Sequence, residues 1–175
     1  MFTLYIVRHG EAEGNVQQVL QGQTHGRLTA LGRTQARQAS QLLADIPVDV
    51  FISSDLQRAI ETCHLLAEPH PDAEILTTPL LRERDWGNFT GRFIPDVQGI
   101  PFPDNVETLP QLQARAQQFL DEVATRHSRQ VVVAVSHGIM LKAIQAVFYH
   151  KQMREVEKMG NAEVRQLLSN KAEKL

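Results

Sequence analysis

Three short runs of mostly apolar residues limit the possible folds of this chain more than any other feature of its sequence. They cover Thr3 to Val7, Val48 to Ile52 and Val131 to Val135, and none alternates between polar and apolar residues. Such runs are typical of strands buried on both faces, as in a parallel sheet covered by helices on each side. Weaker runs from Glu74 to Thr77 and from Val164 to Leu168 predict two further strands, the second at an edge of the sheet.

The segments between these runs show the spacing of amphipathic helices. Thr29 is the predicted N-cap of a helix that continues to Asp45, and Asp55 is expected to cap the next one. Further helices are predicted from Leu112 to Arg126 and from Ile139 to Tyr149. The apolar residues at helical spacing are Leu31, Ala39, Leu42, Leu43, Ala59, Leu65, Leu66, Ala116, Phe119, Leu120 and Val123. This alternation predicts an α/β fold, a three-layer α/β/α sandwich with a mainly parallel central sheet.

Length and composition fit one globular domain over residues 1–175, since 42% of the residues are hydrophobic. The formal net charge of −2 gives no electrostatic reason to expect a nucleic-acid partner or an acidic membrane surface. The single cysteine, Cys63, excludes an intrachain disulfide and is expected to be a buried helix residue. No apolar segment has the roughly 18 residues of a membrane span, and no signal peptide is recognisable, so we expect a cytoplasmic protein.

All lysines of the chain lie near the C-terminus. Glutamates are interspersed among them, and such a mixture of charges is typical of a solvated surface. We therefore expect a solvated tail there in place of a binding tail. The lysines are Lys142, Lys151, Lys158, Lys171 and Lys174.

Arginine and histidine side chains follow the predicted buried strands. Arg8 and His9 come directly after the first run, Arg58 lies just inside the helix after the second, and His137 follows the third. In open α/β sheets, ligands bind at the carboxyl ends of the strands, so we expect these side chains to share one crevice. A glycine follows each histidine, as expected where the backbone turns sharply or a ligand comes close.

The expected crevice suits a phosphoryl group. It holds two guanidinium groups and two imidazoles, and the sequence has no cysteine cluster and no cluster of acidic residues spaced to bind a metal. Arginine binds phosphate oxygens bidentately and stays charged at any relevant pH. A neutral imidazole nitrogen is a competent nucleophile near pH 7, and neighbouring positive charge favours that neutral form. The residues therefore predict a site for phosphoryl chemistry.

Five ordered groups of residues, over about residues 4 to 142, resemble the motifs of the histidine phosphatase superfamily in its phosphoglycerate mutase-like branch. The groups are Arg8-His9-Gly10 with Glu11 and Asn15; Leu28-Thr29 with Gly32, Gln35 and Ala36; Ser54 with Arg58-Ala59 and Thr62; Leu81 with Glu83 and Gly87; and Ser136-His137-Gly138. The resemblance implies a phosphoglycerate mutase-like fold and an enzyme of phosphoryl transfer.

The resemblance also implies a role for each matched residue. His9 attacks phosphorus and becomes a phosphohistidine, while Arg8, Arg58 and His137 hold the non-bridging oxygens. Glu83 protonates the leaving oxygen and then accepts a proton from water, which requires a carboxyl that is protonated part of the time near pH 7. No metal or other cofactor is implied, because the arginines supply the positive charge. The residues expected to contact the substrate are Asn15, Gln21, Gly22, Trp86 and Gly138.

Four departures from the mutase pattern favour a phosphatase. Mutases carry a long insertion with paired arginines after the glutamate motif, but here the interval from Gly91 to Leu112 is short and Arg92 is its only cation. The other departures are Ala12 in place of a serine, Trp86 in place of a tyrosine and Ile139 in place of a polar residue. We predict hydrolysis of a small phosphate ester, with residues of about 88–110 as a short lid-like loop.

Three other functions stay open from the sequence: mutase-type phosphoryl transfer, hydrolysis of protein phosphohistidine, and non-catalytic phosphate binding by a scaffold protein. The scaffold is disfavoured because all five residues with catalytic roles in the resemblance are intact. The sequence makes no prediction of the oligomeric state.

Overall fold

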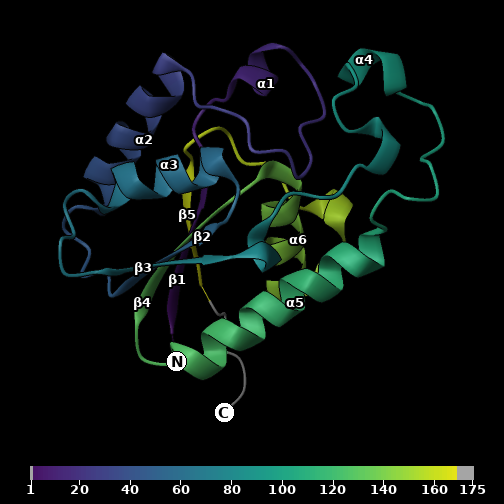
Figure 1. The fold of residues 1–175 in the computed structure, drawn as a ribbon. Helices are drawn as coiled ribbons and strands as arrows, with labels where there is room; N and C mark the ends of the chain where they lie inside the picture. The colour runs from purple at the N-terminus through teal and green to yellow at the C-terminus, as the bar shows by residue number, and fades with distance from the viewer. Residues whose placement is uncertain (1, 169–175) are drawn as a thin grey trace.

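The computed structural model of the protein describes residues 2–168, and its centre is a five-stranded sheet. The strands are β1 (Thr3–Arg8), β2 (Val50–Ser54), β3 (Glu74–Thr78), β4 (Val131–Ser136) and β5 (Val164–Leu167). They lie in the order β3-β2-β4-β1-β5 (Figure 1), with β5 antiparallel to β1 and the other pairs parallel. The sequence predicts all five strands, and the observed bounds agree to within two residues.

Helices cover both faces of this sheet. They are α1 (Glu13–Val16), α2 (Ala30–Leu43), α3 (Gln57–Ala67), α4 (Ile94–Val97), α5 (Leu109–Arg126) and α6 (Gly138–Phe148), with the 3₁₀ turns η1 (Pro79–Leu81), η2 (Gly87–Phe89) and η3 (Met153–Glu155). The pair α2 and α3 packs on one face, and the pair α5 and α6 packs on the other (Figure 1). This arrangement confirms the predicted three-layer sandwich.

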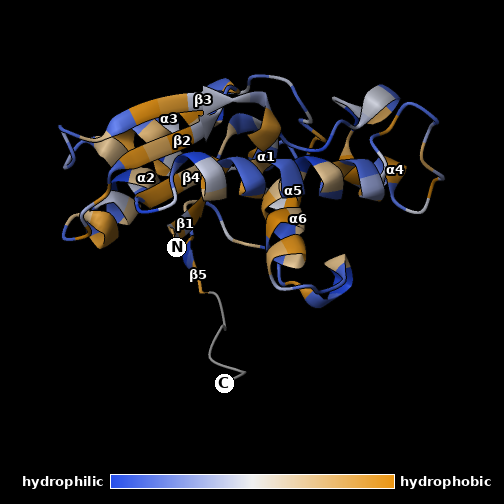
Figure 2. Ribbon diagram, turned by 90° about the horizontal axis from the view of Figure 1, so that it is seen from below, coloured by the Kyte–Doolittle hydropathy of each residue, from blue (hydrophilic) through white to orange (hydrophobic). Residues whose placement is uncertain are grey.

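Each face of the sheet has its own apolar core. Leu4 and Ile6 of β1 belong to the core that includes Phe119 of α5, whereas Val7 belongs to the core that includes Leu43 of α2. Much of β2 and of α6 accordingly shows hydrophobic colours in Figure 2. Successive residues of a strand point to opposite faces, so burial of both faces explains why the sequence of β1 does not alternate.

The helix α2 begins as predicted, but a different set of its residues is buried. Thr29 is the N-cap, and its Oγ1 accepts a hydrogen bond from the Gly32 N–H at 3.0 Å. Leu31 and Leu42 are 53% and 71% exposed, so their expected burial is wrong. Gly32 allows the start of the helix to lie against the backbone of Glu11, since a Cβ there would lie 2.0 Å from the carbonyl oxygen of Glu11. The buried residues are Gly32, Ala36, Ala39, Ser40 and Leu43.

The predicted cap of α3 is also wrong. The N-cap residue is Leu56, and no side chain caps the helix. The Asp55 carboxylate instead accepts hydrogen bonds from Nε and Nη2 of Arg82 at 2.7 and 2.6 Å. Arg82, 27 residues further along the chain, thus binds the carboxylate that local sequence predicts as the helix cap. Of the apolar residues expected on the buried face of α3, Leu65 is only half-buried.

The remaining expectations concern the loops and the tail. Cys63 is fully buried, as predicted. Residues 88–110 contain α4 and otherwise mostly irregular backbone. Lys171 and Lys174, which belong to the predicted solvated tail, lie outside the described residues. Among residues 2–168, no helix combines the length and the apolar character that crossing a membrane requires.

Candidate active site

A cavity of about 270 Å³ lies where β1 ends and α6 begins. Most of its wall consists of residues that the sequence predicts for the site: Arg8, His9, Asn15, Gln21, Gly22, Arg58, Glu83, Trp86 and Gly138. The other residues of the wall are Val19, Leu20, Ile94, Ile139 and Lys158. The carboxyl end of a central parallel strand therefore carries the pocket, as the general rule for such sheets requires.

His9 follows β1 directly and is buried, with one ring nitrogen held and the other directed at an arginine. Its Nδ1–H donates to the carbonyl oxygen of Gly10 at 2.7 Å. Because a carbonyl can only accept, the ring proton lies on Nδ1 and Nε2 carries the lone pair. Burial, followed by the charge of Arg58, lowers the pKa of His9 from 6.5 to about 3. The ring is therefore neutral and nucleophilic at neutral pH.

Arg58 extends from the first turn of α3 and is 1% exposed. Its Nε–H donates to Nε2 of His9 at 3.3 Å. The remainder of the guanidinium binds backbone carbonyl oxygens of Gly22, at 2.9 Å, of His25, at 3.0 Å, and of Thr24. Burial lowers the pKa of Arg58 to about 10, so the side chain keeps its charge at neutral pH.

Arg8 and His137 each hold one buried nitrogen without a hydrogen-bond partner among the described residues: Nε of Arg8 and Nδ1 of His137. The Nη1 of Arg8 donates to the carbonyl oxygen of Met159 at 2.8 Å. His137 is fully buried beside His9, with ring centroids 5.2 Å apart, and its Nε2 lies 2.8 Å from Oγ of Ser54. Burial, followed by Arg58, lowers the pKa of His137 well below 6.5. His137 does not itself line the cavity, but it lies directly beside His9, which does.

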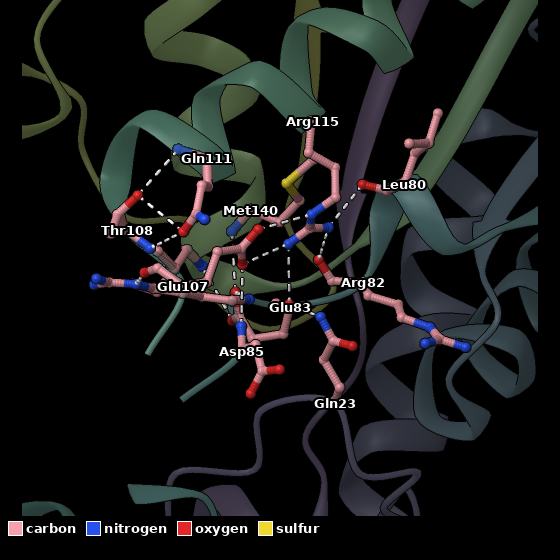
Figure 3. A network of polar contacts seen from close by, with 12 residues as sticks. Gln23, Leu80, Arg82, Glu83, Asp85, Glu107, Thr108, Gln111, Arg115 and Met140 are labelled. Carbon is pink, nitrogen blue, oxygen red and sulfur yellow. Dashed lines mark hydrogen bonds and ion pairs between the residues drawn. The ribbon is translucent and has the colours of Figure 1, made fainter. Parts of the chain in front are cut away.

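Glu83 lies in the loop between η1 and η2, and its carboxylate binds the start of α6. Its Oε2 accepts from the backbone N–H of Ile139 at 3.1 Å, and its Oε1 accepts from Met140 at 3.1 Å and from Arg84 at 2.8 Å (Figure 3). The first N–H groups of a helix have no partners within the helix, and the Glu83 side chain supplies acceptors for two of them. The helix that follows His137 thus holds the predicted acid in the cavity wall.

A stack of side chains supports the aromatic part of the cavity wall. The Arg84 guanidinium lies 4.7 Å from the ring centroid of Trp86 and 4.9 Å from that of Phe102. Arg84 is only 7% exposed, and its Nε donates to the carbonyl oxygen of Glu107 at 2.7 Å. Residues of the 88–110 loop are therefore packed against the same short segment that carries Glu83.

A segment before β5 holds the backbone of the two residues at the end of β1. The N–H of Ala162 donates to the carbonyl oxygens of Arg8, at 3.0 Å, and of His9, at 3.2 Å. The Nδ2 of Asn161 donates to the same His9 oxygen at 3.1 Å. Together with the Arg8 bond to Met159, these contacts fix the position of the nucleophile from a part of the chain about 150 residues later.

Sequence reasoning missed Lys158 as a residue of the cavity wall. Lys158 and Arg8 both lie close to Gly138. A Cβ added to Gly138 would be 3.3 Å from Cε of Lys158 and 3.5 Å from Nε of Arg8. Burial and then the charge of Arg8 lower the pKa of Lys158. The sequence predicts that this lysine belongs to a solvated tail. Lys158 is indeed exposed, but it also lines the cavity. No local spacing reveals which part of a tail folds over a distant strand end.

The charges of the wall suit an anion. Arg8, Arg58 and Lys158 contribute three cations, whereas Glu83 is the only carboxylate among the lining residues. Within residues 2–168, no group of three or more histidine, cysteine, aspartate and glutamate side chains is arranged to hold a metal ion. A phosphate ester, with two negative charges near neutral pH, fits this excess of positive charge.

Comparisons with known proteins agree with this geometry. The family model described as "Histidine phosphatase superfamily (branch 1)" matches residues 4–173. The "Uncharacterized phosphatase PhoE" of Bacillus subtilis is 32% identical over 155 residues, which cover 82% of this chain and 76% of that protein. The "Probable phosphoglycerate mutase GpmB" of Proteus mirabilis is 34% identical over 158 residues, which cover 81% and 72%.

The fold of a solved relative agrees as well. The structure of a mycobacterial glucosyl-3-phosphoglycerate phosphatase in complex with VO3 matches this one with a TM-score of 0.86 at 27% sequence identity. The match covers 95% of this chain and 90% of the other. The family model spans nearly the whole chain, and all the predicted site residues except His137 line one cavity. The chain therefore belongs to the histidine phosphatase superfamily.

Proposed function

We propose that the protein is a phosphomonoesterase that hydrolyses a small phosphorylated metabolite through a phosphohistidine on His9. The observation that carries the proposal is the pairing of a neutral His9, whose Nε2 keeps its lone pair, with the guanidinium of Arg58 in a cationic cavity. Membership of the superfamily and a relative named as a phosphatase support hydrolysis.

In the first step the Nε2 lone pair of His9 attacks phosphorus, and the bond from phosphorus to the ester oxygen breaks. Glu83 gives its proton to that leaving oxygen, so the alcohol departs neutral. The Arg58 Nε–H that now donates to Nε2 of His9 then turns to a phosphoryl oxygen, because the lone pair has become the new P–N bond. In the second step water attacks phosphorus, Glu83 takes the water proton, and inorganic phosphate leaves His9.

Arg8, Arg58 and His137 hold the non-bridging oxygens in both steps. The unpartnered Nε of Arg8 and Nδ1 of His137 support this assignment, since a phosphoryl oxygen satisfies both. Fixed donors stabilise the charge that shifts among these oxygens without reorganising, and removal of one such donor typically costs about 10²–10³-fold in rate. The arginines supply this charge, so the proposed reaction needs no metal.

The other wall residues that the sequence predicts for the site contact the substrate. We assign Asn15, Gln21, Gly22, Trp86 and Gly138 to this role because all five line the cavity. Residues 88–110 act as a partial lid, an assignment supported by Ile94, which also lines the cavity. The lid and the rest of residues 1–175 work as one domain.

Mutase-type transfer is a second candidate, because the relative from Proteus mirabilis is named a probable phosphoglycerate mutase. A mutase returns the phosphoryl group to a second oxygen of a bound acid and must exclude water from the phosphoenzyme. The apolar Ile139 in the cavity wall offers no polar contact to such an acid, which favours hydrolysis.

A phosphate-release assay tests the proposal. We expect steady-state release of phosphate from an aryl phosphate and from members of a metabolite panel, with loss of turnover in His9→Ala. Labelling of the wild-type protein should give an acid-labile, base-stable phosphoryl adduct. Interconversion of 2- and 3-phosphoglycerate faster than hydrolysis would establish the mutase instead. Activity confined to a phosphohistidine protein would establish a protein phosphatase, and phosphate binding without turnover would establish a scaffold.

A further inference from the structure

An ion pair outside the cavity, between Arg115 of α5 and Glu107, lies directly behind the loop that carries Glu83. The Arg115 Nε–H donates to Oε1 of Glu107 at 3.0 Å, and Nη2 donates to Oε2 at 2.8 Å. The two side chains are 17% and 12% exposed. A nearly buried pair gains little net stability from its own attraction, because both charges lose their hydration. The other contacts of the pair therefore indicate what it does.

The N–H groups of Arg115 that do not bind Glu107 point to the backbone of η1 and of the loop that carries Glu83 (Figure 3). Nη1 donates to the carbonyl oxygens of Leu80, at 2.9 Å, and of Arg82, at 2.7 Å. Nη2 donates to the carbonyl oxygen of Glu83 at 3.2 Å. One rigid guanidinium thus binds three carbonyls within four consecutive residues.

Glu107 holds the other side of the same loop. Its Oε2 accepts from the backbone N–H of Asp85 at 3.1 Å, and its own N–H donates to the carbonyl oxygen of Asp85 at 2.9 Å. Its carbonyl oxygen accepts from Nε of Arg84 at 2.7 Å. The pair therefore binds the chain on both sides of Glu83, while the Glu83 carboxylate is held from the cavity side by the start of α6.

We infer that the Arg115–Glu107 pair positions Glu83 for proton transfer to the leaving oxygen. This inference rests on the proposed function, in which Glu83 is the acid. Neither Arg115 nor Glu107 lines the cavity, so both are positioning residues. Proton transfer needs hydrogen-bond distance, and a displacement of about 1 Å can cost on the order of 10²-fold in rate.

The choice of substrate separates a positioning role from a general loss of structure. A leaving group that is stable as an anion, such as 4-nitrophenolate, needs little help from an acid, whereas phenolate needs more. We expect Arg115→Met to lower kcat/KM for phenyl phosphate about 10- to 100-fold, because the variant loses part of the rate that a general acid usually contributes. For 4-nitrophenyl phosphate, we expect kcat/KM to fall less than about threefold. Arg115→Lys keeps the positive charge but loses the planar guanidinium that binds several acceptors at once. Its kcat/KM for phenyl phosphate should therefore lie between the values of wild type and Arg115→Met.

Three further variants complete the experiment. Glu83→Gln is the reference for loss of the acid, Glu107→Gln tests the other half of the pair, and Arg33→Met is the matched control. Arg33 forms an ion pair with Glu61 of α3 at 2.5 Å and does not line the cavity. The control should affect both substrates alike, and by less than about twofold. Circular dichroism verifies that each variant is folded. If Arg115→Met does not fold, the single variants Arg115→Lys and Glu107→Gln replace it in the comparison.

The outcomes distinguish the inference from the proposed function. Selective loss on phenyl phosphate in Glu83→Gln and in the Arg115 or Glu107 variants supports both. Selective loss in Glu83→Gln, with equal losses on the two substrates in folded Arg115 and Glu107 variants, overturns the inference and leaves the function intact. Equal losses in Glu83→Gln show that Glu83 is not the acid; they overturn the inference and the role of Glu83 in the proposed function, while phosphate release that depends on His9 still supports hydrolysis.

Discussion

The Nε–H of Arg58 donates to Nε2 of His9 across 3.3 Å, so a buried cation faces the nitrogen that the proposed reaction uses as nucleophile. Burial, and after it this contact, keeps protons away from the His9 lone pair, because a charged imidazole would lose its hydration and lie against the guanidinium. It also orients the ring toward the place where phosphoryl oxygens must bind. Arg58 thus contributes to both the protonation state and the direction of His9, together with burial and the Gly10 carbonyl oxygen.

The lowered pKa of His9 makes the stability of the fold depend on pH. In the unfolded chain His9 takes up a proton near pH 6.5, whereas in the folded protein it does so only near pH 3. Between these values the unfolded state binds the extra proton, so the free energy of unfolding falls as the pH falls, by up to about 1.4 kcal/mol per pH unit for this residue. Urea unfolding of wild type and His9→Asn at pH 7, 6 and 5 should show a shallower decline in the variant. Equal slopes would contradict the assignment.

Replacement of Arg58 by lysine should reduce activity even though the charge is kept. An ammonium group cannot reach His9 and the carbonyls of Gly22, Thr24 and His25 together. We expect kcat/KM in the phosphate-release assay to fall about 10²–10³-fold. Each carbonyl left without a donor should also cost about 1–3 kcal/mol of stability, measurable by urea unfolding. An Arg58→Lys variant with wild-type kcat/KM would show that charge alone suffices.

Lys158→Met should weaken substrate binding more than it slows the reaction. The lysine lies in the wall beside Arg8 but is far more exposed, so its attraction for a dianionic ester is screened by water and salt. We expect KM to rise about three- to tenfold at low ionic strength with kcat changed less than about twofold. The difference from wild type should shrink in high salt. Lys151→Met, at a lysine that does not line the cavity, is the matched control and should leave KM unchanged.

Gly32→Ala should destabilise the protein, because the start of α2 lies against the backbone of Glu11. A Cβ at this position would lie 2.0 Å from a carbonyl oxygen, so one of the two segments must move. We expect a loss of about 1–3 kcal/mol in the free energy of unfolding. Gly160→Ala is the control, since its Cβ would meet only a side-chain oxygen of Glu163 at 3.6 Å, an ordinary contact. A similar free energy of unfolding for the two variants would contradict this expectation and show that the backbone at Glu11 can move at little cost.

The parts of this structure that local sequence determines could be predicted, and the parts that depend on distant contacts could not. The apolar runs of β1, β2 and β4 identify a sheet covered on both faces, and Thr29 caps α2 as its type suggests. Asp55 has equally good capping chemistry, but Arg82 binds it from another loop. Spacing along one helix cannot reveal such a competitor.

The same distinction holds for the candidate site. The motif residues around His9, Arg58 and Glu83 come together because parallel strands end at the same edge of the sheet. Lys158 reaches the cavity only because the segment before β5 folds over that edge. Likewise, only the packing of α5 reveals what Arg115 binds.

The dependence of His9 on Asn161 and Ala162 has a consequence for biosynthesis. A ribosome that has released only β1 to β4 has already delivered the nucleophile, both arginines and the acid, yet the edge that steadies the nucleophile is still missing. The growing polypeptide should thus stay inactive until the segment around Asn161 and Ala162 has emerged and folded over the end of β1.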